Sequence, residues 1–230
     1  MTPPVFKPVA DHAVLVTFGT EIAEDTHRAV LALDRALMAD PPQGMIETVP
    51  ALVNLLVDFD PLVTDHAAIT SDISERLTGL RIETVTGRER VVQVCYDAAL
   101  APDLAAVAKA TGLSREAVIA AHLSGNYRVL MYGFVPGYAY LGGVPAPIRV
   151  PRKPSPVRDI PAGSLLIAGP QCLVTSLTMP TGWSVIGRSP TRIMTRDQAR
   201  PFFFDVGDTV RFERIDRADF DRLTRESAHG

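Results

Sequence analysis

The strongest constraint on the fold is a change in the chain after Tyr127, where proline and glycine repeatedly interrupt short runs of β-forming residues. Short strands separated by turn residues are typical of a barrel or a sandwich. A last stretch, 216–225, has Phe220 and Leu223 on one side and charged residues elsewhere, which predicts an amphipathic helix. The β-like runs lie at 127–132, 164–169, 172–177, 183–187, 191–194 and 208–214.

The first part of the chain alternates strand and helix signals, with Gly19 and the Pro41-Pro42 pair ending two of the apolar patterns. The predicted order, β-α-β-β-α-β, is typical of a ferredoxin-like split βαβ domain. The predicted elements are a strand at 13–18, a helix at 22–38, strands at 45–49 and 52–59, a helix at 65–78 and a strand at 80–85.

A predicted linker at 86–90 leads to a strand at 91–96 and two short helices, 103–111 and 115–123. Pro102 suits the start of the first helix, and Ser114 can cap the second one. We therefore predict an α+β chain with a small ferredoxin-like domain at 1–86 and a β domain at 87–230.

Composition narrows the possible functions. Apolar residues make up 47% of the 230 residues, enough for a sizeable core, and the formal net charge of −3 offers no basic field for nucleic acid. The sequence shows neither a signal peptide nor an apolar membrane span, so we expect a cytoplasmic protein. Cys95 and Cys172 match no metal or disulfide pattern, and we expect both to be reduced and buried.

Two segments carry candidate binding residues. The glycine-rich run 133–145 surrounds Phe134, Tyr138 and Tyr140, which is consistent either with a ligand pocket or with a compact loop packed by its own aromatic rings. The segment 149–164 holds four cations between prolines, consistent with an anion site or with a solvated loop. The four cations are Arg149, Arg152, Lys153 and Arg158.

Three further polar residues lie at the ends of predicted elements. Gln171 and Arg188 adjoin β-like runs, where a ligand contact and a structural hydrogen bond or salt bridge are about equally consistent with the sequence. His122 lies late in a helix, whose dipole would favour the protonated ring, and a helix-capping role is the simpler interpretation. The histidines and cysteines form no metal pattern, and we find no catalytic triad motif.

A series of short motifs runs in order through residues 90–195. In these motifs the chain resembles the family that comprises the B subunit of 5-oxoprolinase, allophanate hydrolase subunit 1 and the Kip-type sporulation kinase inhibitor. The N-terminal part fits that family more loosely, through its length and its order of strands and helices. The motifs are VCY at 94–96, PDL at 102–104, YRV at 127–129, GF-PG--YLGG at 133–143, PR at 151–152, PAGS at 161–164, IAG-Q at 167–171 and GW--IGRSP at 182–190.

The resemblance implies a cyclophilin-like β-barrel domain after the small domain, the two corresponding to portions C and D of a carboxyltransferase unit. It also implies a companion with portions A and B, similar to the C subunit of 5-oxoprolinase, and a third partner similar to the A subunit of that enzyme. Such a complex opens 5-oxoproline to glutamate with ATP, which would be bound with or by the partner subunits. For a small carboxylated or amide substrate, the candidate binding residues are Tyr140, Arg152, Arg158, Gln171, Arg188, His122 and Phe134.

The sequence departs from the family pattern in places that bear on the substrate. Ala99 stands where the family usually has a glutamate, so a carboxylate suited to acid–base chemistry is absent. The usual QTGIYP reads QCLVTS at 171–176, and SPGGW reads MPTGW at 179–183. A related enzyme acting on another lactam, amide or carboxylated compound would fit as well.

Two other functions stay open from sequence alone. A regulatory protein that inhibits a sensor histidine kinase would need an exposed apolar surface in place of a polar pocket. A cyclophilin-like prolyl isomerase is the weakest alternative, because the resemblance extends to that fold and not to isomerase motifs.

Overall fold

The computed structural model describes residues 3–82 and 87–229. The chain forms two compact units, residues 1–85 and 86–230, and each has its own hydrophobic core. Within the described part of the chain, no helix is long and apolar enough to cross a lipid bilayer.

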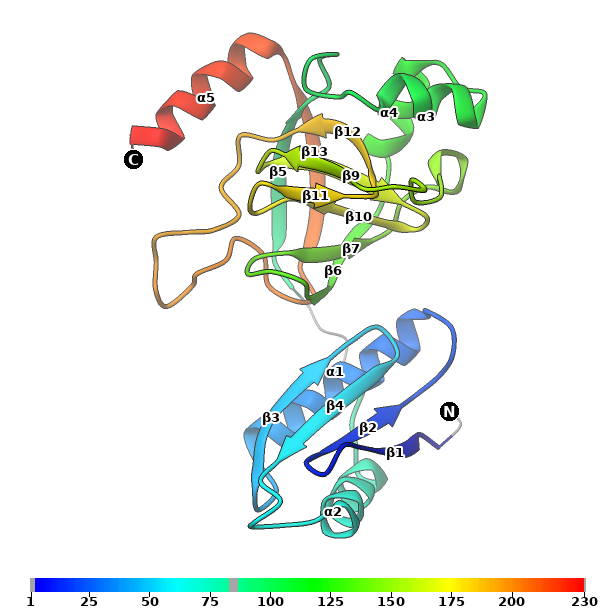
Figure 1. Cartoon of the computed structure of the whole chain (residues 1–230), viewed down its shortest axis with the longest axis vertical. Coiled ribbons are helices and arrows are strands. Elements are labelled where there is room, and N and C mark those ends of the chain that lie inside the picture. Colours follow the sequence, from blue (N-terminus) through cyan, green and yellow to red (C-terminus); the bar gives the residue numbers. More distant parts are fainter. Residues whose placement is uncertain (1–2, 83–86, 230) are drawn as a thin grey trace. The chain divides into compact units, whose positions relative to one another are not determined.

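The first unit is a four-stranded antiparallel sheet whose strands lie in the order β1-β2-β4-β3, with two helices packed on it (Figure 1). Val16, Leu33 and Phe59 are fully buried between sheet and helices. The elements are β1 (Val5–Val9), β2 (Ala13–Thr17), α1 (Glu24–Ala39), β3 (Met45–Pro50), β4 (Asn54–Phe59) and α2 (His66–Thr78).

One edge of this sheet differs from the prediction. The order is that of a ferredoxin-like sheet, but the edge strand beside β2 is the N-terminal strand β1, joined to it by a tight turn at Ala10 (φ 49°). Pro8 hid this strand from sequence reasoning, although an edge strand tolerates proline. The strand predicted at 80–85 is wrong at 80–82, which is irregular, and the rest of it lies outside the described residues.

The second unit (Figure 1) is a closed seven-stranded barrel in the order β10-β7-β6-β13-β5-β12-β9. Strands β8 and β11 form a separate antiparallel pair. The predicted α+β class with a β-barrel is thereby confirmed. The strands are β5 (Glu89–Cys95), β6 (Tyr127–Tyr132), β7 (Ala139–Gly142), β8 (Val157–Ile160), β9 (Ser164–Ala168), β10 (Gln171–Val174), β11 (Met179–Thr181), β12 (Ser184–Arg188) and β13 (Thr209–Ile215). The helices are α3 (Leu104–Thr111), α4 (Arg115–Leu123), the 3-10 helix η1 (Ala146–Ile148) and α5 (Arg217–His229).

Alternate residues of the barrel strands face two different cores. Val94, Leu141 and Ile167 point into the barrel and pack with α3 and α4. On the outer side, Leu173 and Trp183 belong to a second cluster that includes Ile160 of β8 and Met179 of β11. The run predicted as a strand at 191–194 forms a single bridge, Met194 to Phe202, within the long β12–β13 loop.

Candidate functional site

A cavity of about 360 Å³ lies where the end of β12 meets the β12–β13 loop, the β8–β9 turn and α5. Arg188 is the last residue of β12, and Phe220 reaches the cavity from α5. No aspartate or glutamate of the described chain lines it. The lining residues are Ala162, Gly163, Thr175, Ser176, Arg188, Ser189, Pro190, Thr191, Arg192, Ile193, Met194, Phe220, Thr224 and Ser227.

Arg188 is the half-buried cation of this cavity. Its Nε donates to the carbonyl oxygen of Ala162 at 3.2 Å, and its guanidinium carbon lies 6.0 Å from the centre of the Phe220 ring. Burial lowers the pKa of Arg188, although a guanidinium remains charged at neutral pH. Among residues 3–82 and 87–229 no carboxylate lies within ion-pair distance of it, so the cavity holds a partly desolvated positive charge that an anion would neutralise.

The hydroxyl groups of the cavity fall into two sets. Thr175 Oγ1 donates to the carbonyl of Pro161 at 2.9 Å and accepts from the Ser164 amide at 2.9 Å, so it is used by the fold. The side-chain hydroxyl groups of Thr224 and Ser227 on α5 form no hydrogen bond with the described residues and are available to a ligand. The arrangement suits a small anion with further polar groups.

Gly163 fixes the shape of the cavity. Its amide donates to the Thr175 carbonyl at 2.7 Å, and its own carbonyl accepts from the Ser189 amide at 2.8 Å. Its φ of 81° favours glycine, and an added Cβ would lie only 2.4 Å from the Ser189 carbonyl oxygen. The PAGS motif therefore holds three segments of the cavity wall together.

Four other predicted residues lie outside the cavity. The ring of Tyr140 on β7 packs edge-on against the ring of Trp183, with 5.9 Å between the two ring centres. The guanidinium carbon of Arg152 lies 5.5 Å from the centre of the Trp183 ring. Burial raises the pKa of Tyr140. Gln171 begins β10 opposite Gly142 and Ala168, and Arg158 is exposed on β8.

The fifth, Phe134, is 72% exposed, in a loop before β7. Arg188 is thus the one predicted binding residue among the described residues that line the cavity.

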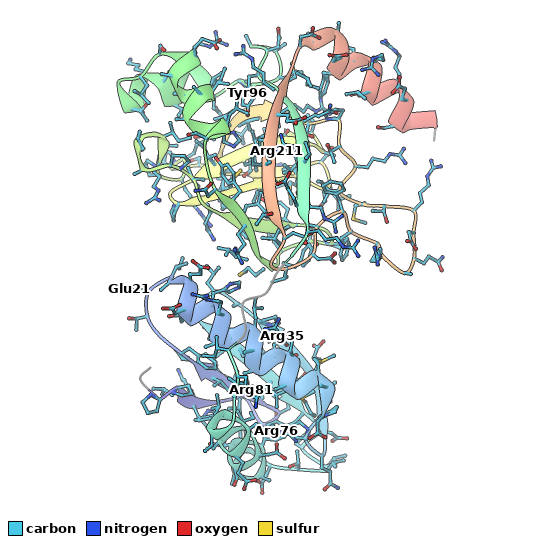
Figure 2. The ribbon with its side chains drawn as sticks, turned by 180° about the vertical axis from the view of Figure 1, so that it is seen from behind. Glu21, Arg35, Arg76, Arg81, Tyr96 and Arg211 are labelled. Carbon is cyan, nitrogen blue, oxygen red and sulfur yellow. The ribbon has the colours of Figure 1, made fainter. Side chains whose placement is uncertain are left out.

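His122 lies inside the barrel core and has no exposed surface. Its Nδ1 is 2.9 Å from Tyr96 Oη, and its Nε2 is 3.8 Å from the thiol of Cys172 (Figure 2 labels Tyr96). Burial lowers the pKa of His122 to about 3, so the expected protonated ring at a helix end is wrong: desolvation outweighs the helix dipole. The contacts give this residue a packing role.

Comparisons with known proteins identify the family. Residues 4–204 match the model described as "Carboxyltransferase domain, subdomain C and D". The chain belongs to this carboxyltransferase family. It is 36% identical over 230 residues to the B subunit of 5-oxoprolinase from Bacillus subtilis, an alignment that covers 95% of this chain and 96% of that protein.

Solved structures agree with this assignment. The structure of TTHA0988 is similar with a TM-score of 0.78 and 35% identity, over 89% of this chain and 40% of that one. Urea carboxylase of Kluyveromyces lactis is similar in fold, with a TM-score of 0.81 at 14% identity over 99% of this chain. The chain spans only 23% of that protein. The kinase-inhibitor alternative is not favoured, because the curated relatives are named as 5-oxoprolinase subunits.

The segments in which this carboxyltransferase chain departs from its family pattern have different surroundings. Thr175 and Ser176, in the altered 171–176 segment, line the cavity. Ala99 lies on an exposed turn, where its amide donates to the Asp97 carboxylate at 3.0 Å, and it does not line the cavity.

Sequence reasoning missed the hydroxyls of the cavity and its α5 residues. The available signal was the apolar side of the predicted C-terminal helix, which contains Phe220. The sequence did not indicate where that helix packs, and its packing is what brings Phe220 to the cavity.

Proposed function

We propose that this chain is one subunit of an ATP-dependent 5-oxoprolinase complex, inactive alone, and that the cavity around Arg188 binds the carboxylate of the substrate. The relatives named as B subunits of 5-oxoprolinase support the reaction. The observation that carries the site is the half-buried Arg188 guanidinium without a carboxylate partner in the described chain.

The chemistry of 5-oxoproline fits such a cavity. Its carboxylate is attached to the carbon beside the ring nitrogen, so a guanidinium that binds the carboxylate would also orient the lactam bond. Arginine is suited to this because its planar fork can donate two parallel hydrogen bonds to a carboxylate. Phe220 would contact the ring methylenes, while Thr224 and Ser227 could bond the lactam amide.

We assign ATP to the partner subunits. The glycine-rich run 133–143 contains β7, and no α-helix follows it directly, so it does not present the helix N-terminus that phosphate-binding loops use. The companion with portions A and B would complete the carboxyltransferase unit, and a third partner would join for the ATP-dependent step. Such a complex would work in the cytoplasm, where ATP is available.

Glutamate release from 5-oxoproline tests the proposal. We expect ATP-dependent release from the complete set of subunits and none from this chain alone. In the complete complex, Arg188→Gln should raise KM about 10- to 100-fold, the loss of a charge-assisted hydrogen bond pair, and Arg188→Lys should be intermediate.

Arg211→Gln is the matched control. Arg211, labelled in Figure 2, lies on β13. It pairs with Glu89 and Glu213 at the surface, so its replacement should leave KM unchanged. A folded complex that releases no glutamate would rule out 5-oxoproline and direct attention to related amides and urea derivatives. An unchanged KM in Arg188→Gln would rule out the cavity.

A further inference from the structure

Phe134 combines two unfavourable features. Its side chain is 72% exposed, and its backbone has a φ of 76°, in the left-handed region that bulky residues rarely adopt. The centre of its ring lies 5.6 Å from the centre of the Tyr138 ring, an aromatic contact within its own loop. A strained residue that holds an aromatic ring in solvent is a sign of a contact made outside the chain.

The loop that carries Phe134 is fixed to the wall of the cavity. The Ser176 hydroxyl donates to the Pro136 carbonyl at 2.7 Å. A Cβ placed on Gly137 would lie 3.1 Å from Met194 Sδ and 3.3 Å from Ser176 Cβ. Since Ser176 and Met194 both line the cavity, Phe134 lies on a loop that forms the outer side of the cavity wall.

Two more apolar side chains are exposed beside this loop. Leu177 follows Ser176 and is 43% exposed, and Met194 is 37% exposed. We call Phe134, Leu177 and Met194 the apolar rim. Scattered exposed apolar residues are normal, but three on the segments that border one polar cavity indicate a protein interface.

The β12–β13 loop adds positive charge beside the apolar rim. Residues 191–200 hold three arginines and one aspartate, a formal charge of +2 in a chain whose total is −3. This loop extends away from the barrel (Figure 1), and within the described chain no carboxylate forms an ion pair with Arg192 or Arg200. An acidic surface would complement it.

We infer that the apolar rim is the docking surface for the companion carboxyltransferase subunit, which presents an apolar patch bordered by acidic residues. This inference rests on the proposed function for the identity of the partner. Docking at the rim places the partner next to the Arg188 cavity, where it would contribute groups to the substrate site. The strain at Phe134 is kept because the exposed ring is needed for association.

Direct binding to the purified companion tests the surface. We expect Phe134→Asp to weaken binding more than about tenfold, as for a central interface residue. Leu62→Asp is the matched control, since Leu62 is 94% exposed on the first unit, and it should bind normally. Arg200→Gln should slow association most at low salt.

Phe134→Gly separates docking from a structural role. Glycine removes the backbone strain, so the isolated protein should melt higher, by about 2–4 °C, while binding weakens. A merely structural phenylalanine would give a lower melting temperature instead.

Normal binding of the companion by both Phe134 variants would overturn the inference. It would also be overturned if the chain self-associates, and if Phe134→Asp abolishes that self-association but leaves binding to the companion unchanged. A complex that binds as expected but releases no glutamate would overturn the proposed reaction and leave the docking surface supported.

Discussion

Mild acid should destabilise the barrel through His122. The folded pKa is about 3, whereas the ring in the unfolded chain titrates near 6.5. Below pH 6.5 the unfolded state takes up a proton that the folded state excludes, so the contribution present above pH 6.5 is lost as pH falls toward 3. The loss is about 1.4 kcal/mol per pH unit, which amounts to about 2 kcal/mol in the free energy of unfolding at pH 5.

Urea unfolding at pH 7.5 and pH 5 measures this loss in the wild type and in His122→Asn. Trp183, the one tryptophan of the sequence, is buried in the barrel unit and reports its unfolding by fluorescence. The variant should be less stable at pH 7.5, because the Tyr96 contact and the packing are disturbed. The difference between the two proteins should shrink by about 2 kcal/mol at pH 5, since only the wild type loses the His122 contribution.

Other titrating groups cancel in this comparison. His12, whose pKa is raised chiefly by its hydrogen bond to Asp58, would favour folding in acid, but it is present in both proteins. A stability difference that stays constant from pH 7.5 to pH 5 would refute the reasoning and show that the folded barrel accommodates a charged ring.

Two further predictions concern stability and are measured by thermal or urea unfolding. Gly163→Ala should lower the free energy of unfolding by about 2 kcal/mol or more, because the new side chain meets both a positive φ and the Ser189 carbonyl oxygen. Gly169→Ala should lower it by about 1 kcal/mol, because Gly169 has a φ of 53° but open space around it. Equal losses would contradict this view of the cavity wall. Asp208 is buried and accepts three hydrogen bonds, one from a guanidinium, so Asp208→Asn should cost about 3 kcal/mol. Glu116→Gln, at an exposed ion pair, should change the free energy of unfolding far less, and a similar loss at both sites would contradict the role of burial.

Local signals predicted much of the fold. α4 occupies 115–123 as expected, because Ser114 Oγ accepts from the Ala117 amide at 3.1 Å. Gly112, in the left-handed conformation, ends α3. β6 was likewise predicted at its observed bounds.

The strands that were missed in the second unit share a physical cause. β7, β8 and β11 are three or four residues long and lie among prolines and glycines, so their pairing depends on partners distant in sequence. Tertiary contacts also decided the site. Arg188 could be proposed from its place after an apolar run, but its lack of a carboxylate partner in the described chain and its contact with Phe220 depend on how α5 packs. For His122, the dipole of α4 was visible in the sequence and the complete burial was not.

The parallel pairing of β5 with β13 has a consequence for synthesis on the ribosome. Glu89 pairs with Thr209, so the seam of the barrel joins the first and last strands of the unit. Until β13 emerges, β5 and β6 each have one edge without its native neighbour, because β13 lies between them. A nascent or truncated chain that stops before Thr209 would therefore present two open edges to other chains, and we expect such fragments to aggregate or to need a chaperone.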